Sequence, residues 1–502
     1  MFKKVLIANR GEIALRVIRA CREMGVGTVI AYSEADRDSL PVRLADERIC
    51  IGPGPSSKSY LHIPNLISAA MLSGCEAIHP GYGFLSENPS FAEICADCGI
   101  VFIGPPPAAM VQMGDKVQAR DAMLRGGLPM LPGTDILRSV GEGVAAASRI
   151  GFPLMLKAAA GGGGRGIRLV RRAEEFDHVF TTAQSEVREA FHDDGLYVEK
   201  YLGRARHVEV QVLCDNYGNG VHLGERNCSV QRRHQKLIEE SPSPGLRPEL
   251  RREMGQRAIA AALAIGYRGV GTLEFLVDED NHYYFMEMNT RLQVEHPVTE
   301  WVTGIDLVQA QLRVASGERL WFTQDDVVLR GHAIEFRITA EDPAYDFRPQ
   351  TGTIERYLPP SGPGTRVDSH LYLGYEVPPH YDSLLAKLVV WAPTRAEAIA
   401  RGRRALSEYE IEGVPTTIPF HLKMLDHEIF QRGATYTNFL AERGEELGIK
   451  GEEARSGSGA SAVRLKRFAI IAVATERHNR VGGVITGEPA CSVPGVERDQ
   501  TC

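Results

Sequence analysis

Short apolar runs alternate with helical patterns through residues 1 to about 113, and this alternation limits the possible folds more than any other feature. The apolar runs cover residues 5–8, 28–32, 77–79 and 100–103, with helical patterns at 13–24 and 63–72. Strands separated by helices predict βαβ units and a parallel sheet. The turn after the first run, residues 9–13, lacks the G-x-G-x-x-G fingerprint, which counts against a dinucleotide-binding site.

The rest of the chain divides into three further regions. Most polar motifs fall between residues 114 and 330. Alternating segments such as 331–338 and 384–391 then return up to about residue 446, interrupted by a Pro/Gly loop at 359–364. Beyond that, small and polar residues dominate, and we expect 447–502 to be a poorly ordered tail whose apolar run 468–474 can dock as a strand.

Composition excludes several classes of protein. The 502 residues are 43% hydrophobic and 24% charged, with a net charge of −7, as in soluble globular proteins of several domains. This weakly acidic balance disfavours nucleic acid and anionic lipid as partners. No apolar run approaches the roughly 18 residues of a membrane span, and the start does not read as a signal peptide.

The nine cysteines show no disulfide pattern, which suits a reducing compartment. We therefore expect a cytoplasmic protein. Cys95 and Cys98 have C-x-x-C spacing, but they close a helical pattern at Gly99 and have no second pair. We interpret them as two small core residues rather than a zinc or redox site.

A glycine run lies between two apolar segments at residues 155–170. The first segment ends in Lys157, glycines occupy 161–164, and Arg165 precedes the second segment. This pattern predicts a hairpin whose tip exposes backbone N–H groups to phosphate oxygens. It is not a Walker loop, because the lysine precedes the glycines and no helix follows. A flexible linker is the alternative; we favour a mobile, phosphate-covering loop.

Two strand patterns, 272–278 and 283–289, flank four turn residues. If 278 lies opposite 283, then Glu274 lies opposite Glu287, and both share a face with Asn289. Carboxylates about 5 Å apart either raise one pKa or hold a cation between them. The all-oxygen set suits Mg²⁺ or Mn²⁺. A solvated face is the alternative, and a register error of one residue would remove the site.

Two polar segments add candidate anion-binding groups. In residues 290–297, Arg291 can hold a small planar oxyanion bidentately, and Glu295 can accept a proton from it. Alternatively, these two residues form a surface ion pair. Residues 226–236 are locally basic and suit phosphate or bicarbonate, although a solvated loop would have the same composition.

Four long strings, at residues 8–14, 79–88, 232–236 and 287–297, give the chain a specific resemblance. From residue 3 to about 446 it resembles the biotin carboxylases of the ATP-grasp superfamily, which carboxylate biotin in acyl-CoA and pyruvate carboxylases. The resemblance implies an α/β and α+β chain: a Rossmann-like domain at 1–113, an ATP-grasp domain at 114–330 with a mobile glycine-rich lid at about 131–203, a C-terminal mixed domain at 331–446, and the tail.

The resemblance also implies roles for individual residues, and it alone marks Asn9 and Tyr82. ATP would be surrounded by Lys116, Lys157, Glu199, Lys200, Tyr201, Leu202, His207 and His234, with Gly163 and Gly164 in the closing loop and Tyr82 among the binding residues. Divalent metal would be held by Glu274, Glu287 and Asn289. The bicarbonate pocket would consist of Lys236, Arg291, Gln293, Val294 and Glu295. Glu295 would be the base, Arg337 would stabilise the biotin enolate, and a dimer helix would carry Arg16, Arg19 and Glu23.

The implied activity is that of an ATP-dependent ligase that carboxylates biotin with bicarbonate through carboxyphosphate, using two Mg²⁺ or Mn²⁺ ions. No Ala-Met-Lys-Met attachment sequence occurs in the chain, so biotin would arrive on a separate biotin carboxyl carrier protein. A separate carboxyltransferase would complete an acetyl-CoA carboxylase of fatty acid biosynthesis, or else a pyruvate or other acyl-CoA carboxylase. A homodimer is expected. Ala160 departs from the family, which often has glycine there.

Three other functions are compatible with parts of the sequence to different degrees. Another ATP-grasp ligase would share the metal residues and the glycine loop but act on an amine or amino acid. A nucleotide-sensing protein would bind ATP without bicarbonate-dependent hydrolysis. A dehydrogenase is disfavoured by the missing dinucleotide fingerprint.

Overall fold

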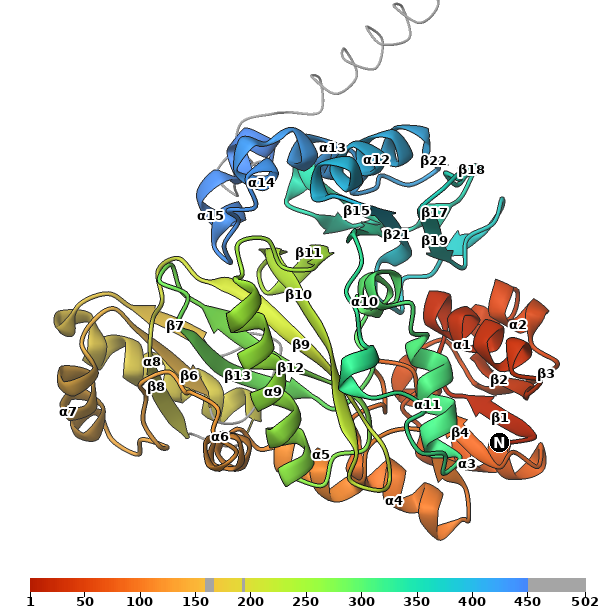
Figure 1. Cartoon of the computed structure of the whole chain (residues 1–502), viewed down its shortest axis with the longest axis horizontal. Coiled ribbons are helices and arrows are strands. Elements are labelled where there is room, and N and C mark those ends of the chain that lie inside the picture. Colours follow the sequence, from red (N-terminus) through yellow and green to blue (C-terminus); the bar gives the residue numbers. More distant parts are fainter. Residues whose placement is uncertain (159–166, 192–194, 450–502) are drawn as a thin grey trace, which may run out of the picture. The chain divides into compact units, whose positions relative to one another are not determined.

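The computed structural model describes residues 1–158, 167–191 and 195–449 (Figure 1). Residues 1–449 form one compact unit. The predicted tail from residue 450 onward, Ala160 and the glycines at 161–164 lie outside the described residues. Within the described ranges, no helix is both long enough and apolar enough to cross a membrane.

The N-terminal region contains the predicted parallel sheet, with strand order β3-β2-β1-β4-β5. Its edge strand β3 was not predicted, because it begins with two charged residues and only Ile51 among its six residues is buried. The strands are β1 (Lys4–Ile7), β2 (Gly27–Ser33), β3 (Glu47–Gly52), β4 (Ala77–His79) and β5 (Val101–Phe102). The helices of this region are α1 (Gly11–Glu23), α2 (Leu40–Leu44), α3 (Ile63–Leu72), α4 (Pro89–Asp97) and α5 (Pro107–Gly114).

The C-x-x-C pair lies at the end of α4. Cys95 is fully buried beside Phe91, whereas Cys98 follows the last helical residue and is exposed. The prediction of two core cysteines is therefore right for Cys95 and wrong for Cys98, because the helix ends before the second cysteine can turn inward.

The glycine-run segments form the predicted hairpin. Strand β6 (Leu154–Ala158) pairs antiparallel with β7 (Ile167–Val170), so that Lys157 lies opposite Ile167, and with β8 (Leu196–Lys200). Helices α7 (Val140–Ile150) and α8 (Ala173–Phe191) supply a separate apolar core that includes Phe176 and Phe180. This small core sets the hairpin region, the expected lid, apart from the eight-stranded sheet.

An eight-stranded sheet, in the order β13-β12-β9-β10-β11-β14-β21-β19, carries most of the remaining chain. It crosses the expected domain boundary at residues 330/331, since β11 pairs with β14. The two regions therefore share one sheet. Its strands are β9 (Arg206–Cys214), β10 (Gly220–Arg232), β11 (Gln235–Ser241), β12 (Gly269–Val277), β13 (Tyr283–Asn289), β14 (His332–Thr339), β19 (Thr365–Ser369) and β21 (Leu384–Ala392).

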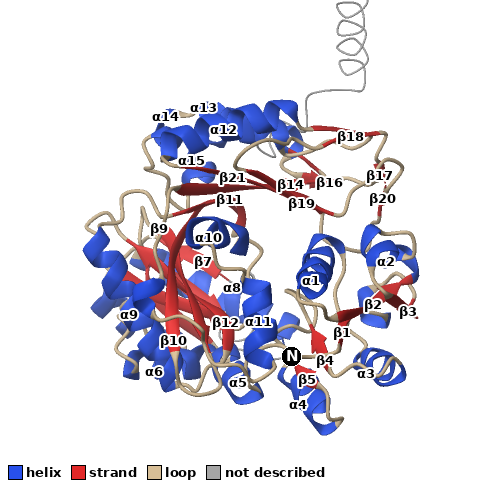
Figure 2. Cartoon of the chain, turned by 45° about the vertical axis from the view of Figure 1, so that its right-hand side comes forward, coloured by secondary structure: helices blue, strands red, loops and turns tan. Residues whose placement is uncertain are grey.

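Helices cover both faces of this sheet (Figure 2). On one face α12 (Arg395–Glu408) and α13 (Ile418–Asp426) pack on Phe336 and Leu388; on the other, α10 (His296–Thr303) packs through Val298 on Val389. The remaining helices are α6 (Lys116–Arg125), α9 (Pro248–Ala264), α11 (Leu307–Ala315), α14 (Glu428–Gln431) and α15 (Phe439–Arg443). Short pairs are formed by β15 (Glu341–Asp342) with β16 (Arg348–Pro349), β17 (Gly352–Thr353) with β20 (Glu376–Val377), and β18 (Arg356–Leu358) with β22 (Glu410–Glu412).

Candidate active site

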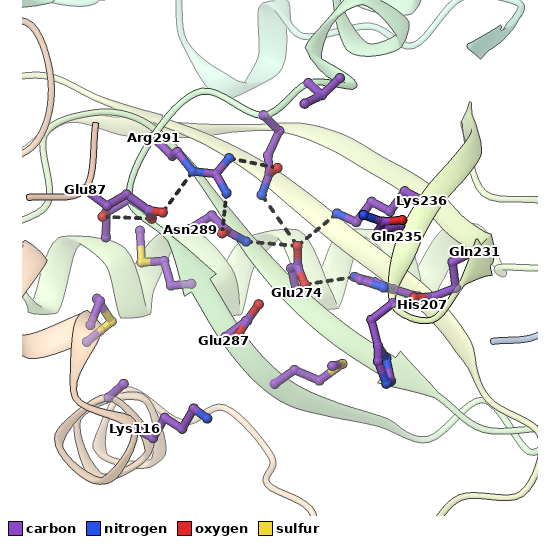
Figure 3. A pocket seen from close by; sticks show the side chains of 18 of the residues that line it. Glu87, Lys116, His207, Gln231, Gln235, Lys236, Glu274, Glu287, Asn289 and Arg291 are labelled. Atoms are coloured by element: carbon purple, nitrogen blue, oxygen red, sulfur yellow. Dashed lines mark hydrogen bonds and ion pairs between the residues drawn. The ribbon is translucent and has the colours of Figure 1, made fainter. Parts of the chain in front are cut away.

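A cavity of about 1290 Å³ opens between the N-terminal loops, the lid sheet and the eight-stranded sheet, and Figure 3 shows part of its lining. Glu295 is fully buried behind this lining. Gly163 and Gly164 lie outside the described residues. The predicted residues that line the cavity are Tyr82, Lys116, Lys157, Glu199, Lys200, Tyr201, Leu202, His207, His234, Lys236, Glu274, Glu287, Asn289, Arg291, Gln293, Val294 and Arg337.

The two acidic residues face each other across β12 and β13, as predicted. Glu274 pairs with Glu287 in the ladder. Near the turn, however, Val277 rather than Asp278 lies opposite Tyr283, so the predicted turn register is wrong by one residue. A bulge at Met286 adds one residue to β13 and restores the expected pairing at the acids.

The bulge also decides which side chains face the cavity. Before it, Tyr283 and Phe285 point into the core with Phe275. After it, Met288 takes the buried core position, and Glu287 is exposed toward the cavity that both residues line. Without the extra residue, strict alternation from Phe285 would put Glu287 in the core.

Glu274 and Glu287 sit in different electrostatic environments (Figure 3). Glu274 accepts a hydrogen bond from Asn289 Nδ2 at 2.9 Å and lies 2.9 Å from Lys236 Nζ and 3.1 Å from His207 Nε2. Burial opposes its ionisation, but Lys236 and His207 outweigh it and hold the pKa of Glu274 well below its usual range. Enclosure in the cavity wall, followed by repulsion from Glu274, raises the pKa of Glu287.

This acidic set has the chemistry of a site for a hard divalent cation. The side-chain oxygens of Glu274, Glu287 and Asn289 come from adjacent strands, and an added cation would relieve the repulsion that raises the pKa of Glu287. His207, Glu209 and Glu274 also bring potential ligand atoms within 4.8 Å of one another. Sequence reasoning missed Glu209, because β9 alternates polar and apolar residues, and such a pattern does not distinguish a buried glutamate from one that faces solvent.

Lys236, in the cavity lining, forms ion pairs with three carboxylates. Its Nζ lies 2.5 Å from Glu209, 2.9 Å from Glu274 and 2.6 Å from Glu295. Burial alone would lower the pKa of Lys236, but the three acids raise it well above its usual range. The ammonium therefore remains charged and supplies fixed positive charge beside the cavity.

Glu295 is buried between two cations. Its second oxygen accepts from Arg337 at 2.8 Å, and Arg337 also donates to Glu239 at 2.6 Å. Although burial opposes ionisation, Lys236 and Arg337 hold the pKa of Glu295 well below its usual range. For Glu239 burial is the larger influence, and it raises that pKa to about 7. Glu295 is thus an ionised acceptor next to the cavity.

Arg291 points toward the N-terminal region rather than toward Glu295. Its Nε donates to Glu87 at 2.9 Å, and its terminal nitrogens donate to Gln293 at 3.1 Å and Asn289 at 3.2 Å. The alternative of an Arg291–Glu295 surface pair is therefore wrong. Glu87 also accepts from the Thr290 backbone N–H. It was not predicted as a site residue, because some 200 positions separate it from Arg291.

One lysine and one arginine hold Glu199 on the lid side of the cavity. Its carboxylate lies 2.5 Å from Lys157 and 3.1 Å from Arg120, a residue that the sequence did not single out. Lys116 donates to the Ala158 carbonyl at 3.3 Å, and burial lowers its pKa. His234 lies in the two-residue turn between β10 and β11 with φ +67°, and burial also lowers its pKa.

Asn9 and Tyr82, which only the resemblance marked, both make hydrogen bonds between the segment at the start of α1 and the loop after β4. Asn9 Nδ2 donates to the carbonyls of Pro80 at 2.7 Å and Tyr82 at 2.8 Å, which holds this loop at the cavity. The Tyr82 hydroxyl donates to Glu12 at the start of α1. Both contacts span about 70 residues of chain and leave no local pattern.

The residues of the expected dimer helix differ in exposure. Arg16 is buried and pairs with Glu300 at 3.0 Å and Asp306 at 2.6 Å within the same chain. Arg19 and Glu23 lie on the exposed side of α1, and Glu23 accepts a hydrogen bond from Gln309.

Comparisons with known families cover nearly all of residues 1–442. A family described as "Biotin carboxylase, N-terminal domain" matches residues 1–110, and one described as "Biotin carboxylase C-terminal domain" matches 335–442. Between them, residues 115–322 match "Carbamoyl-phosphate synthase L chain, ATP binding domain".

Individual relatives extend over the same region. The chain is 58% identical over 442 residues to a protein named biotin carboxylase from Nostoc sp. (strain PCC 7120), covering 88% of this chain and 99% of the relative. It is 53% identical over 443 residues to a pyruvate carboxylase subunit of Methanothermobacter thermautotrophicus, covering 88% and 90%. A crystal structure of the biotin carboxylase domain dimer of Hydrogenobacter thermophilus 2-oxoglutarate carboxylase, with MgADP, ADP and bicarbonate, has a TM-score of 0.86 at 49% identity and covers 90% of this chain and 100% of that one.

Proposed function

Because the chain belongs to the biotin carboxylase family of the biotin-dependent carboxylases, we propose that its cavity carboxylates carrier-bound biotin with bicarbonate at the expense of ATP. One observation supports placing this activity in the cavity. The residues suited to magnesium are in direct contact with the anion-binding cations, since Asn289 accepts from Arg291 and Glu274 pairs with Lys236. The solved relative with MgADP and bicarbonate supports the same choice of ligands.

The nucleotide would lie between the lid and the acidic hairpin. Lys116, Lys157 and His234 line this side of the cavity and supply cationic or donor groups for phosphates. Glu199, Lys200, Tyr201, Leu202 and His207 complete the proposed ATP site, with Gly163 and Gly164 in the closing loop. Glu274, Glu287 and Asn289 would hold two Mg²⁺ or Mn²⁺ ions, which neutralise phosphate charge when bound.

Bicarbonate would bind against Arg291 with Gln293 and the Val294 backbone N–H. Arg291 would exchange its hydrogen bonds to neighbouring side chains for a bidentate contact with the anion. Bicarbonate then attacks the γ-phosphate, which yields carboxyphosphate and ADP. The fixed charge of Lys236 stabilises the developing negative charge at the reacting oxygens.

Carboxyphosphate next breaks down to CO₂ and phosphate inside the closed cavity, where exclusion of water prevents its hydrolysis. Phosphate takes the N1′ proton of biotin, and the resulting enolate attacks CO₂. Arg337, which lines the cavity, would stabilise this enolate, and Glu295 would accept the proton of bicarbonate. The proton transfer requires bicarbonate to approach Glu295 while Lys236 and Arg337 keep it oriented.

We propose that biotin arrives on a separate carrier protein and that a separate carboxyltransferase transfers the carboxyl group to acetyl-CoA. The resemblance supports this proposal. Pyruvate and 2-oxoglutarate are the competing acceptors, because relatives carry those names. A homodimer, as in the solved relative, and a cytoplasmic location stay predictions.

The test follows ADP release with free biotin, with and without bicarbonate. The wild type should release ADP only when bicarbonate is present. Arg291→Ala and Glu295→Ala should each lose about a hundredfold or more of carboxybiotin formation, because both groups act at the reacting anion. Arg291→Ala should stay folded, because it removes a polar side chain at the cavity wall. Glu295→Ala removes the buried carboxylate between Lys236 and Arg337, so its thermal midpoint should fall and its rate is compared per folded enzyme.

Arg403→Ala is the matched control, because Arg403 forms an exposed ion pair with Asp426 away from the cavity. This variant should keep wild-type rates. Full carboxylation by Arg291→Ala or Glu295→Ala would overturn the roles assigned to these residues, and activity of the wild type on an amine instead of biotin would overturn the proposed substrate.

A further inference from the structure

A fully buried lysine lies behind the cavity wall. Lys387 is on β21, directly opposite Arg337 on β14, and its side chain has 0% exposure. Its Nζ donates to the Val294 carbonyl at 2.9 Å. The same Nζ lies 3.0 Å from Glu12 and 3.9 Å from Asp368.

Lys387 contacts two segments that lie at different parts of the cavity lining. Val294 lines the cavity and directly precedes Glu295 and α10. Glu12, at the start of α1, accepts from the hydroxyl of Tyr82, which also lines the cavity. One ammonium group therefore touches the backbone of the segment assigned to bicarbonate and the carboxylate that holds Tyr82.

The chain segments joined in this way are far apart in sequence. Position 12 belongs to the N-terminal sheet region, position 294 to the loop after β13, and position 387 to the distal part of the eight-stranded sheet. Glu12 is also buried, at 2% exposure of its side chain. Desolvating both partners offsets much of the attraction between them, so such a pair contributes little net stability compared with apolar packing. It does impose a specific geometry, because each charge must keep its partner.

We propose that Lys387 and Glu12 are a positioning pair that sets the Val294–Glu295 backbone and the Tyr82 side chain at the distance that carboxylation requires. This inference rests on the proposed function, because Val294 and Tyr82 matter only if bicarbonate and biotin meet in this cavity. Glu12 lines the cavity and Lys387 does not. The contacts of the pair run to Tyr82, Val294 and Asp368 rather than to the acidic hairpin, so binding of ATP should not depend on it.

The first test is Lys387→Met, which keeps the length of the side chain and removes its charge. Steady-state kinetics with free biotin should show kcat/KM for bicarbonate and for biotin reduced about tenfold or more, while KM for ATP stays within about twofold. A lysine that serves folding alone would reduce the amount of active enzyme without separating these constants. The matched control is Lys423→Met, because Lys423 likewise donates to a backbone carbonyl, that of Leu447, away from the cavity. It should leave all constants unchanged.

Two further variants keep the inference falsifiable if Lys387→Met does not fold. Glu12→Gln keeps the shape of the side chain but loosens its hold on Lys387 and Tyr82; kcat/KM for biotin should fall about fivefold with KM for ATP unchanged. The double variant Glu12→Gln/Lys387→Met removes both charges of the pair, and Asp368 keeps its ion pair with Arg366, so the thermal midpoint should recover in part while the kinetic defect persists.

The outcomes separate the two proposals. If wild-type enzyme shows no bicarbonate-dependent ADP release, the proposed function fails. If the wild type is active and folded Lys387→Met or Glu12→Gln keeps every constant within about twofold, only the positioning pair is overturned. Recovery of wild-type kinetics by the double variant would also overturn it.

Discussion

The two glutamates of the acidic hairpin show how neighbours give identical side chains different properties. Glu274 is surrounded by Lys236, His207 and Asn289, and its pKa is held low; Glu287 faces the cavity, and its pKa is raised. Glu274 is therefore neutralised by the protein itself. Glu287 has negative charge that a cation would stabilise, so it should respond more strongly to metal.

Replacing Glu287 with glutamine should raise the Mg²⁺ concentration needed for half-maximal activity by about tenfold or more, because one anionic ligand is lost. The measurement is the rate of ADP release against free Mg²⁺ at constant ATP. Glu318→Gln, at an exposed ion pair with Arg313, is the control and should leave the curve unchanged. An unchanged Mg²⁺ requirement in Glu287→Gln would remove this residue from the metal site.

At the scale of single elements, helix termini provide independent tests of local stability. Thr394 caps α12 in a capping box with Glu397, in which each side chain bonds to the backbone of the other. Thr394→Ala should lower the free energy of unfolding by about 1 kcal/mol, and Thr394→Ser should restore most of it. Urea unfolding checks this expectation, with unchanged KM values as the sign that the site is unaffected. Equal stability of all three proteins would show that the cap contributes nothing.

Elements with strong local patterns could be predicted from sequence. The first strand, α1, α3 and the lid hairpin follow runs of apolar residues with clear periodicity, and the structure has them within a few residues of the predicted ranges. Strand β3 was missed, since it begins with two charged residues and buries only Ile51. The bulge at Met286 was missed as well, because strand patterns do not reveal an extra residue.

The candidate site could be predicted only where its residues lie close together in the chain. Glu274, Glu287, Asn289 and Arg291 belong to one hairpin and its exit, so strand pairing alone brought them together. Glu87 and Glu209 reach the same cluster from distant segments. The spacing of residues along the chain contains no information about such contacts. Tyr82, which also reaches the cavity from a distant segment, was predicted only from the family resemblance.

For the whole molecule, buried histidines should make stability depend on pH. His421 on α13 is fully buried, bonds to the Arg337 carbonyl, and has a pKa lowered to about 4 by burial. In the unfolded chain the pKa is about 6.5. Between these values the unfolded state binds one more proton than the folded state, so this residue makes the free energy of unfolding fall as pH falls.

His421→Gln tests this expectation, since glutamine keeps a donor for the Arg337 carbonyl but does not titrate. Glu239, with its pKa raised to about 7, acts in the opposite direction, so the difference between the two proteins is the informative quantity. Between about pH 6.5 and 5, the stability of the wild type relative to the variant should fall by about 1.5 kcal/mol. Urea unfolding at both pH values measures it; a constant difference would contradict the assigned pKa.

The eight-stranded sheet gives these residues a common frame, because β12, β11 and β14 carry Glu274, Lys236 and Arg337. Within that frame we expect bicarbonate, rather than water, to attack the γ-phosphate of ATP. Bicarbonate labelled with a heavy oxygen isotope tests it directly, with mass analysis of the phosphate released during biotin carboxylation. Each phosphate should then contain one labelled oxygen derived from bicarbonate. Phosphate that takes its new oxygen from solvent water instead would contradict it.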